Sequence, residues 1–132
     1  VVIVTGAGKG IGQAAAFQFA AAGARVALVD RSADPGEQLA KQLAQDARQA
    51  VFVRADISVE AEVQAMVAEV VQRWGRLDIL VNNAGSYLQG DVVQTSAEGW
   101  ARIMGTNLTG VTVHEVRRAR DASGRGGGEC IV

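Results

Sequence analysis

The residues with the clearest chemical potential form a glycine-rich segment near the N-terminus, Thr5-Gly6-Ala7-Gly8-Lys9-Gly10-Ile11-Gly12. It follows an apolar run, Val1 to Val4, and precedes an alanine-rich stretch that ends at Gly23. Glycine lets backbone N–H groups approach a ligand closely, and the N-terminus of a helix carries partial positive charge. A strand, this segment and a helix in that order therefore favour binding of a diphosphate. The alternative is a tight turn that binds nothing.

The spacing within this segment excludes two common phosphate-binding loops. A G-x-G-x-x-G pattern would require glycine at a position held by Ile11 or Gln13. A Walker A loop would require Ser or Thr after its lysine, but Lys9 is followed by Gly10. The pattern that is present is Thr5-Gly6-x-x-x-Gly10-Ile11-Gly12.

Further polar residues follow later apolar runs. Asp30 follows Arg25 to Val29, Asp56 follows Val51 to Val53, and Asn82-Asn83-Ala84-Gly85 follows Leu77 to Val81. The carboxyl ends of parallel strands lie at one edge of a sheet, where ligands bind, so one pocket could use all of these groups. His114 and Cys130 are each the only residue of their type, and we expect no metal site.

Asp30 is the residue that bears on the choice of nucleotide. A carboxylate at the end of the second strand can accept hydrogen bonds from both hydroxyl groups of an adenosine ribose. It would repel a 2′-phosphate by about 1 to 4 kcal/mol at 4 Å, which favours NAD over NADP. Lys9 and Arg31 could offset this repulsion, so NADP stays possible. The alternative for Asp30 is a surface residue that opens a turn.

The order of elements that must position these groups is strand and helix in alternation. Helices are expected from the glycine-rich segment to Gly23, through Leu39, Leu43 and Ala47, from Ser58 to Gly75, and from a Thr95/Glu98 capping box to about Val116. Ser32 to Gly36 is expected to form a turn, and Arg117 to Gly128 a surface connection. This alternation predicts a Rossmann-like, doubly wound parallel sheet in a three-layer αβα arrangement with strand order 3-2-1-4.

Both ends of the chain predict an incomplete domain. Residues 1–132 form one domain that begins inside a strand at Val1 and stops as a fifth strand starts at Cys130. If only a stub of that strand follows, the edge from Leu77 to Val81 is left unpaired and apolar, which favours self-association.

Composition limits the classes of partner. A formal charge of -1 gives no overall field for nucleic acid or an anionic membrane. No apolar run is long enough to span a bilayer, and no signal-like segment is present. The sequence therefore predicts a cytoplasmic protein that binds neither nucleic acid nor membrane.

Taken together, these motifs resemble the short-chain dehydrogenase/reductase family. Asp56-Ile57 looks like its adenine contact, Asn82 to Gly85 like its strand-four signature, and Thr106-Asn107-Leu108 like the segment with its catalytic asparagine. The resemblance implies hydride transfer between NAD(P) and a small alcohol or carbonyl substrate, and a homo-oligomer formed through the helix near Trp100. It assigns Asn107 to catalysis, although a structural asparagine is the alternative. The residues assigned to cofactor binding are Thr5, Gly6, Gly8, Lys9, Gly10, Ile11, Gly12, Asp30, Arg31, Asp56, Ile57, Asn83, Ala84 and Gly85.

The sequence departs from this family in its catalytic groups. The only tyrosine is Tyr87 and the only lysines are Lys9 and Lys41, so the family's Tyr-x-x-x-Lys pair is absent. We expect Tyr87 to be a partly buried loop residue. Two alternative functions follow: a nucleotide-binding module without catalysis, and a methyltransferase that binds S-adenosylmethionine through the same loop and acid.

Overall fold

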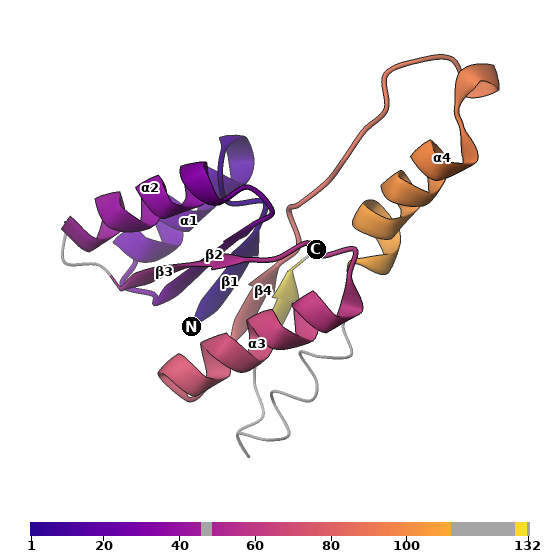
Figure 1. The fold of residues 1–132 in the computed structure, drawn as a ribbon. Coiled ribbons are helices and arrows are strands. Elements are labelled where there is room, and N and C mark those ends of the chain that lie inside the picture. The colour runs from indigo at the N-terminus through magenta and orange to yellow at the C-terminus, as the bar shows by residue number, and fades with distance from the viewer. Residues whose placement is uncertain (46–48, 112–128, 132) are drawn as a thin grey trace.

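The computed structural model describes residues 1–45, 49–111 and 129–131. Its centre is a parallel sheet with strand order β3-β2-β1-β4-β5 (Figure 1). The strands are β1 (Val2–Thr5), β2 (Val26–Asp30), β3 (Ala50–Arg54), β4 (Ile79–Val81) and β5 (Glu129–Ile131). This confirms the predicted order of the first four strands and the start of a fifth.

Four α-helices and two shorter turns of other types connect the strands of the described part of the chain. The α-helices are α1 (Gly10–Ala21), α2 (Ala33–Gln45), α3 (Glu60–Trp74) and α4 (Ala97–Met104). A 3-10 helix, η1 (Val92–Gln94), precedes α4, and a π-helix, η2 (Gly105–Thr109), continues from it. No described helix is long and apolar enough to cross a membrane.

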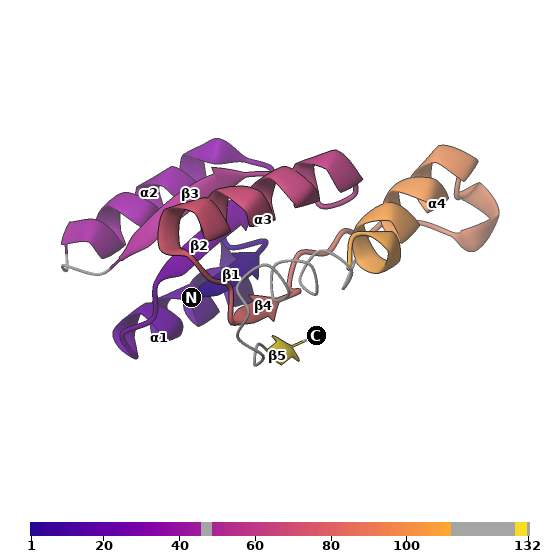
Figure 2. The same ribbon diagram turned by 90° about the horizontal axis from the view of Figure 1, so that it is seen from below.

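The core consists of two separate clusters, one on each face of the sheet. Ile3 of β1 belongs to the cluster beneath α3, whereas its neighbours Val2 and Val4 belong to the cluster beneath α1 and α2. This follows from the alternation of side chains along a strand, and because both faces are covered, the strands are apolar throughout. Figures 1 and 2 show the resulting three layers, with α4 standing apart from them.

The predicted helix ends were partly wrong. Gly75 ends α3 in the left-handed conformation, as expected, but α3 starts after Val59, and the hydroxyl of Ser58 instead donates to Asp56 Oδ1 at 2.6 Å. The predicted turn from Ser32 to Gly36 is wrong, because α2 begins at Ala33. Pro35 lies in the first turn of α2. Proline is tolerated there because its missing N–H would have no partner within the helix.

The N-cap of α4 is also shifted by one residue from the predicted capping box. Ser96 caps the helix, and its Oγ accepts a hydrogen bond from Gly99 N at 3.1 Å. The Thr95 hydroxyl donates to Asp91 O at 3.2 Å instead. The predicted continuation of this helix to about Val116 and the surface connection at 117–128 lie outside the described residues.

The expectation of an unpaired β4 edge was wrong. β4 is shorter than predicted, and all of it, Ile79 to Val81, is paired in parallel with Glu129 to Ile131 of β5. β1 pairs with the other side of the same three residues. The edge that was expected to favour self-association is therefore covered.

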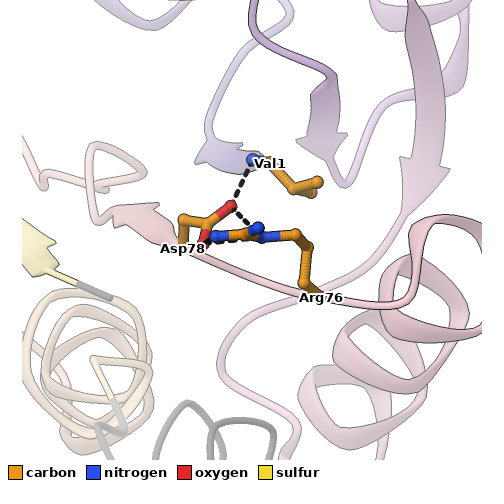
Figure 3. A network of polar contacts seen from close by, with 3 residues as sticks. All are labelled: Val1, Arg76 and Asp78. Carbon is orange, nitrogen blue, oxygen red and sulfur yellow. Dashed lines mark hydrogen bonds and ion pairs between the residues drawn. The ribbon is translucent and has the colours of Figure 1, made fainter. Parts of the chain in front are cut away.

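A polar network of Val1, Arg76 and Asp78 lies just before the first residue of β4, Ile79 (Figure 3). Asp78 Oδ2 accepts a hydrogen bond from the Val1 nitrogen at 2.6 Å, and Arg76 Nε lies 2.8 Å from both carboxylate oxygens. Hydrogen bonding from the Arg76 guanidinium holds the pKa of Asp78 below its usual value. The carboxylate thus joins the entry to β4 to the start of β1.

This network predicts a defined response to acid. Because the pKa of Asp78 is lower in the folded chain, its contribution to stability is complete above the unfolded pKa of about 3.9 and is lost as pH falls through the folded value. In urea denaturation, Asp78→Asn should lower the free energy of unfolding by a constant amount above about pH 5. Below about pH 4 the wild-type and variant curves should converge. The control Glu69→Gln, on the exposed side of α3, should show no such pH-dependent difference from wild type in the free energy of unfolding. If Asp78→Asn were less stable than wild type by the same amount at every pH, the assignment would be contradicted.

Candidate active site

A cleft of about 540 Å³ lies at the edge formed by the carboxyl ends of β1, β2, β3 and β4. Residues from the segments that follow all four strands line it, together with Val29 of β2 and Thr106 of η2. They are Gly6, Lys9, Gly10, Ile11, Val29, Asp30, Arg31, Ser32, Ala55, Asp56, Ile57, Asn83, Ala84, Gly85, Ser86 and Thr106.

The glycine-rich segment forms one wall of this cleft. Gly6 and Gly10 have φ angles of 64° and 61°, which side chains other than glycine rarely adopt, so the turn depends on both. α1 begins at Gly10 and presents its N-terminal N–H groups and the positive end of its dipole at this wall. Ile11 in the first turn lines the cleft yet is 81% exposed, so an apolar surface is open to a ligand here.

Gly8 and Asp30 connect the glycine-rich segment to the end of β2. Gly8 N donates to Asp30 Oδ2 at 3.0 Å, and Ser32 N donates to Oδ1 at the same distance. A Cβ on Gly8 would lie 2.9 Å from Asp30 Oδ2 and 3.3 Å from Pro35 Cβ, so glycine leaves room for the carboxylate to accept this bond. Gly8 is buried and does not line the cleft, whereas Asp30 does. These bonds hold the carboxylate beside the glycine-rich segment.

Thr5 and Asn83 form a second connection, from β1 to the segment after β4. Thr5 is 1% exposed, and its hydroxyl donates to Val81 O at 3.2 Å and accepts from Asn83 N and Ala84 N at 3.0 and 3.1 Å. Asn83 Nδ2 donates to Thr5 O at 2.9 Å and to Gly6 O at 3.3 Å. Thr5 therefore acts from beneath the cleft and does not line it.

Gly12 allows α1 to pack against this connection. A Cβ at position 12 would lie 2.3 Å from Gly6 O and 2.5 Å from Asn83 Nδ2. Gly12 is buried and, like Thr5 and Gly8, does not line the cleft. These three predicted residues shape the loop from behind, while the other predicted cofactor-binding residues line the cleft itself.

Asp56 and Arg31 face each other at the β2 and β3 end of the cleft. An Arg31 guanidinium nitrogen lies 3.7 Å from Asp56 Oδ2, and Asp56 Oδ1 accepts from both Ser58 N and Ser58 Oγ. The bonds from Ser58, and then the charge of Arg31, hold the pKa of Asp56 below its usual value. The Arg31 side chain is exposed, so this ion pair contributes little stability and leaves the guanidinium available to a ligand.

Asn107 lies in the π-helix η2 and reaches back to the segment after β4. Its Oδ1 accepts from Ser86 N at 2.8 Å, and its Nδ2 donates to Ser86 O at 2.9 Å. Gly110 N donates to Gly105 O and Val111 N to Leu108 O, so Val111 does not make the usual helical bond to Asn107 O. Asn107 does not line the cleft itself, although its neighbour Thr106 does.

Sequence reasoning missed several residues of the cleft. Val29 and Ala55 line it beside predicted acids, and Ser32 and Thr106 also adjoin predicted residues, so their positions in the chain were an available signal. Ser86 follows the Asn82 to Gly85 motif, but no pattern marked it. The expectation for Tyr87 was wrong: it is 85% exposed, because the chain leaves the body of the domain here. No cluster of three or more metal-ligating side chains occurs among the described residues.

Comparison with known proteins identifies the family. The sequence model of the family described as short chain dehydrogenase matches residues 1–132. The chain belongs to the short-chain dehydrogenase family. Among curated members, meso-2,3-butanediol dehydrogenase of Serratia marcescens is 41% identical over 111 residues, which cover 84% of this chain and 43% of the relative. L-fucose dehydrogenase of Oryctolagus cuniculus is 42% identical over 112 residues, covering 83% and 38%.

Solved structures of short-chain dehydrogenases share the fold. A 3-ketoacyl-ACP reductase from Sinorhizobium meliloti superposes with a TM-score of 0.91 at 32% identity, covering 98% of this chain and 51% of that one. A gluconate 5-dehydrogenase from Burkholderia cenocepacia, in complex with NADP and tartrate, gives 0.85 at 32% identity with the same coverage. The chain thus spans about half the length of the short-chain dehydrogenases that it matches.

Proposed function

We propose that this chain is the NAD(P)-binding part of an oxidoreductase that transfers hydride between the nicotinamide and a small alcohol or carbonyl substrate. The observation that carries the proposal is the pairing of the glycine-rich segment with the Asp30 carboxylate at one cleft. A diphosphate needs backbone donors and a positive helix end, and the ribose beside it needs an acceptor. When bound, the cofactor supplies or accepts the hydride.

The residues of the cleft fit such a cofactor along its length. The diphosphate is assigned to the N-terminal turn of α1, and the adenosine to the side of β2 and β3, where Asp30, Arg31, Asp56 and Ile57 line the cleft. Because β4 lies on the other side of β1, the nicotinamide is assigned to the segment after β4. An alanine at Gly6 would place its Cβ 2.8 Å from Ala84 Cα. Glycine at this position therefore allows the glycine-rich segment to lie close to the segment after β4.

The catalytic contribution of this chain is assigned to Asn107. The Asn107 amide fixes the backbone of Ser86, and the π-helical turn changes the bonding of the carbonyl groups around position 107. Through the family resemblance, the Asn107 carbonyl would hold a water that relays a proton. Since the sequence contains no Tyr-x-x-x-Lys pair, cofactor binding without turnover is the second candidate for the 132 residues alone.

Helix α4 is the element that we assign to assembly of the protein. Trp100 of α4 is exposed, and α4 stands apart from the three layers, which suits the proposed homo-oligomer. A metal is not part of the proposal, and neither is nucleic acid or membrane.

Titration of the purified chain with NADH, followed by nicotinamide fluorescence, tests the proposal. NADH should bind saturably and be displaced by ADP, whereas S-adenosylmethionine should neither bind nor compete. Assays with a panel of alcohols and ketones then separate a complete enzyme from a binding module. Absence of NADH and NADPH binding to folded protein would refute both candidates.

The choice between NAD and NADP should depend on Asp30. Asp30→Asn removes the negative charge that repels a 2′-phosphate, so NADPH should bind about 10-fold more tightly or better, while NADH weakens. The Kd values for both nucleotides, measured by fluorescence, give the result. Asp34→Asn makes the same charge change in the first turn of α2, outside the cleft, and should leave the ratio of the two Kd values unchanged. Equal ratios in both variants would contradict a ribose contact.

A further inference from the structure

The hydroxyl group of Ser86 is an unexplained polar group in the cleft. Ser86 lines the cleft, and its Oγ is buried without a hydrogen-bond partner among the described residues. Leaving a buried hydroxyl without a partner destabilises a folded protein, so such groups are rare unless they serve another purpose. In a cleft that binds a ligand, the missing partner can be the ligand.

The backbone of Ser86 is held in place independently of its side chain. Asn107 pairs with both the N–H and the C=O of Ser86, at 2.8 and 2.9 Å. Two bonds from one planar amide fix this residue within the segment after β4. The backbone that carries the hydroxyl group is therefore fixed before a ligand arrives, which lowers the cost of ordering this residue on binding.

The position of Ser86 in the fold indicates which part of the ligand it meets. Asp30 and Asp56 follow β2 and β3, whereas Ser86 follows β4, on the other side of β1. The glycine-rich segment follows β1 between them. A dinucleotide with its diphosphate at this segment and its adenosine beside Asp30 extends its other half toward Ser86.

We propose that Ser86 Oγ forms a hydrogen bond with the nicotinamide-riboside half of the cofactor and is a positioning residue for it. This inference rests on the proposed function. A hydroxyl group both donates and accepts, so it suits the ribose hydroxyls and the carboxamide, which do the same.

The experiment measures the binding of two ligands to Ser86→Ala. NADH carries both halves of the cofactor, whereas ADP carries only the adenosine half with its diphosphate. The variant should bind NADH roughly 5- to 10-fold more weakly, as expected for one lost hydrogen bond, and bind ADP as tightly as wild type does. Isothermal calorimetry gives both Kd values on the full chain.

Thermal unfolding of the same variant separates binding from structure. Because the hydroxyl has no partner in the free protein, Ser86→Ala should keep or raise the Tm while it weakens NADH. A lowered Tm with equal losses for NADH and ADP would overturn the proposal in favour of a structural role. Unchanged NADH binding would overturn it as well. Failure of the proposed function is distinct, because wild type would then bind neither ligand.

Discussion

Gly12→Ala is expected to destabilise the fold by about 3 kcal/mol, the upper part of the range for overpacking, and to abolish NADH binding. In most helices this change is stabilising by about 1 kcal/mol, because alanine is the better helix former. Here the new Cβ would lie 2.3 Å from Gly6 O and 2.5 Å from Asn83 Nδ2. α1 must then move away from the glycine-rich segment and from the segment after β4, and the N-terminal turn that is proposed to bind the diphosphate moves with it.

The measurements for this prediction are urea denaturation and NADH titration. Gly105→Ala is the matched control, because its Cβ would lie 3.4 Å from Ser58 Cβ, an ordinary contact, and its φ is not positive. That variant should be as stable as wild type or slightly more so. A stable Gly12→Ala protein that binds NADH would show that α1 does not need this close contact.

Thr5→Val is expected to cost about 2 kcal/mol of the free energy of unfolding, although the two side chains have nearly the same shape. The substitution removes the acceptor of Ala84 N, whereas Asn83 N and Val81 O each lose one bond and keep the bond to each other at 3.1 Å. Leaving Ala84 N without an acceptor costs about 1 to 3 kcal/mol, and part of that is recovered as the segment after β4 shifts. That shift should also weaken NADH, since Asn83 and Ala84 line the cleft.

Thr5→Ser keeps the hydroxyl group and removes only a methyl group. It should therefore retain NADH binding and lose less stability than Thr5→Val in the same denaturation experiment. If the two variants were equally destabilised, the loss would come from packing, and the assigned hydrogen bonds would not be the reason that Thr5 is needed.

The sheet could be predicted because its signal is repeated along the chain. Each apolar run ends in a polar or glycine-containing segment and is followed by helical spacing, and a parallel sheet with right-handed crossovers has few ways to satisfy this order. Helix starts were harder to predict. Ser58 has the right residue type for an N-cap, but its hydroxyl bonds to Asp56 instead. Several candidates compete for such short-range bonds, and the sequence alone does not rank them.

The cleft was predictable only where its residues belong to motifs. Asp30 and Gly8 could be assigned separately, but the bond between them depends on how closely β2 approaches the glycine-rich segment. The unpartnered hydroxyl of Ser86 depends on which groups Asn107 uses, and Asn107 lies 21 residues away. Tyr87 was misplaced because its burial depends on the course of a loop rather than on its residue type.

The division of the interior into two apolar clusters has a consequence for protein engineering. The cluster beneath α3 includes Met66 and Val70, while the glycine-rich segment contributes Ala7 to the cluster beneath α1 and α2. Energetic effects add only when sites share no partners, and the cluster beneath α3 also contains Val29, Ala55 and Ile57, which line the cleft. The face beneath α1 and α2, where Leu39 and Leu43 are buried away from the cleft, is thus the place to raise thermal tolerance while coenzyme preference is altered at the cleft.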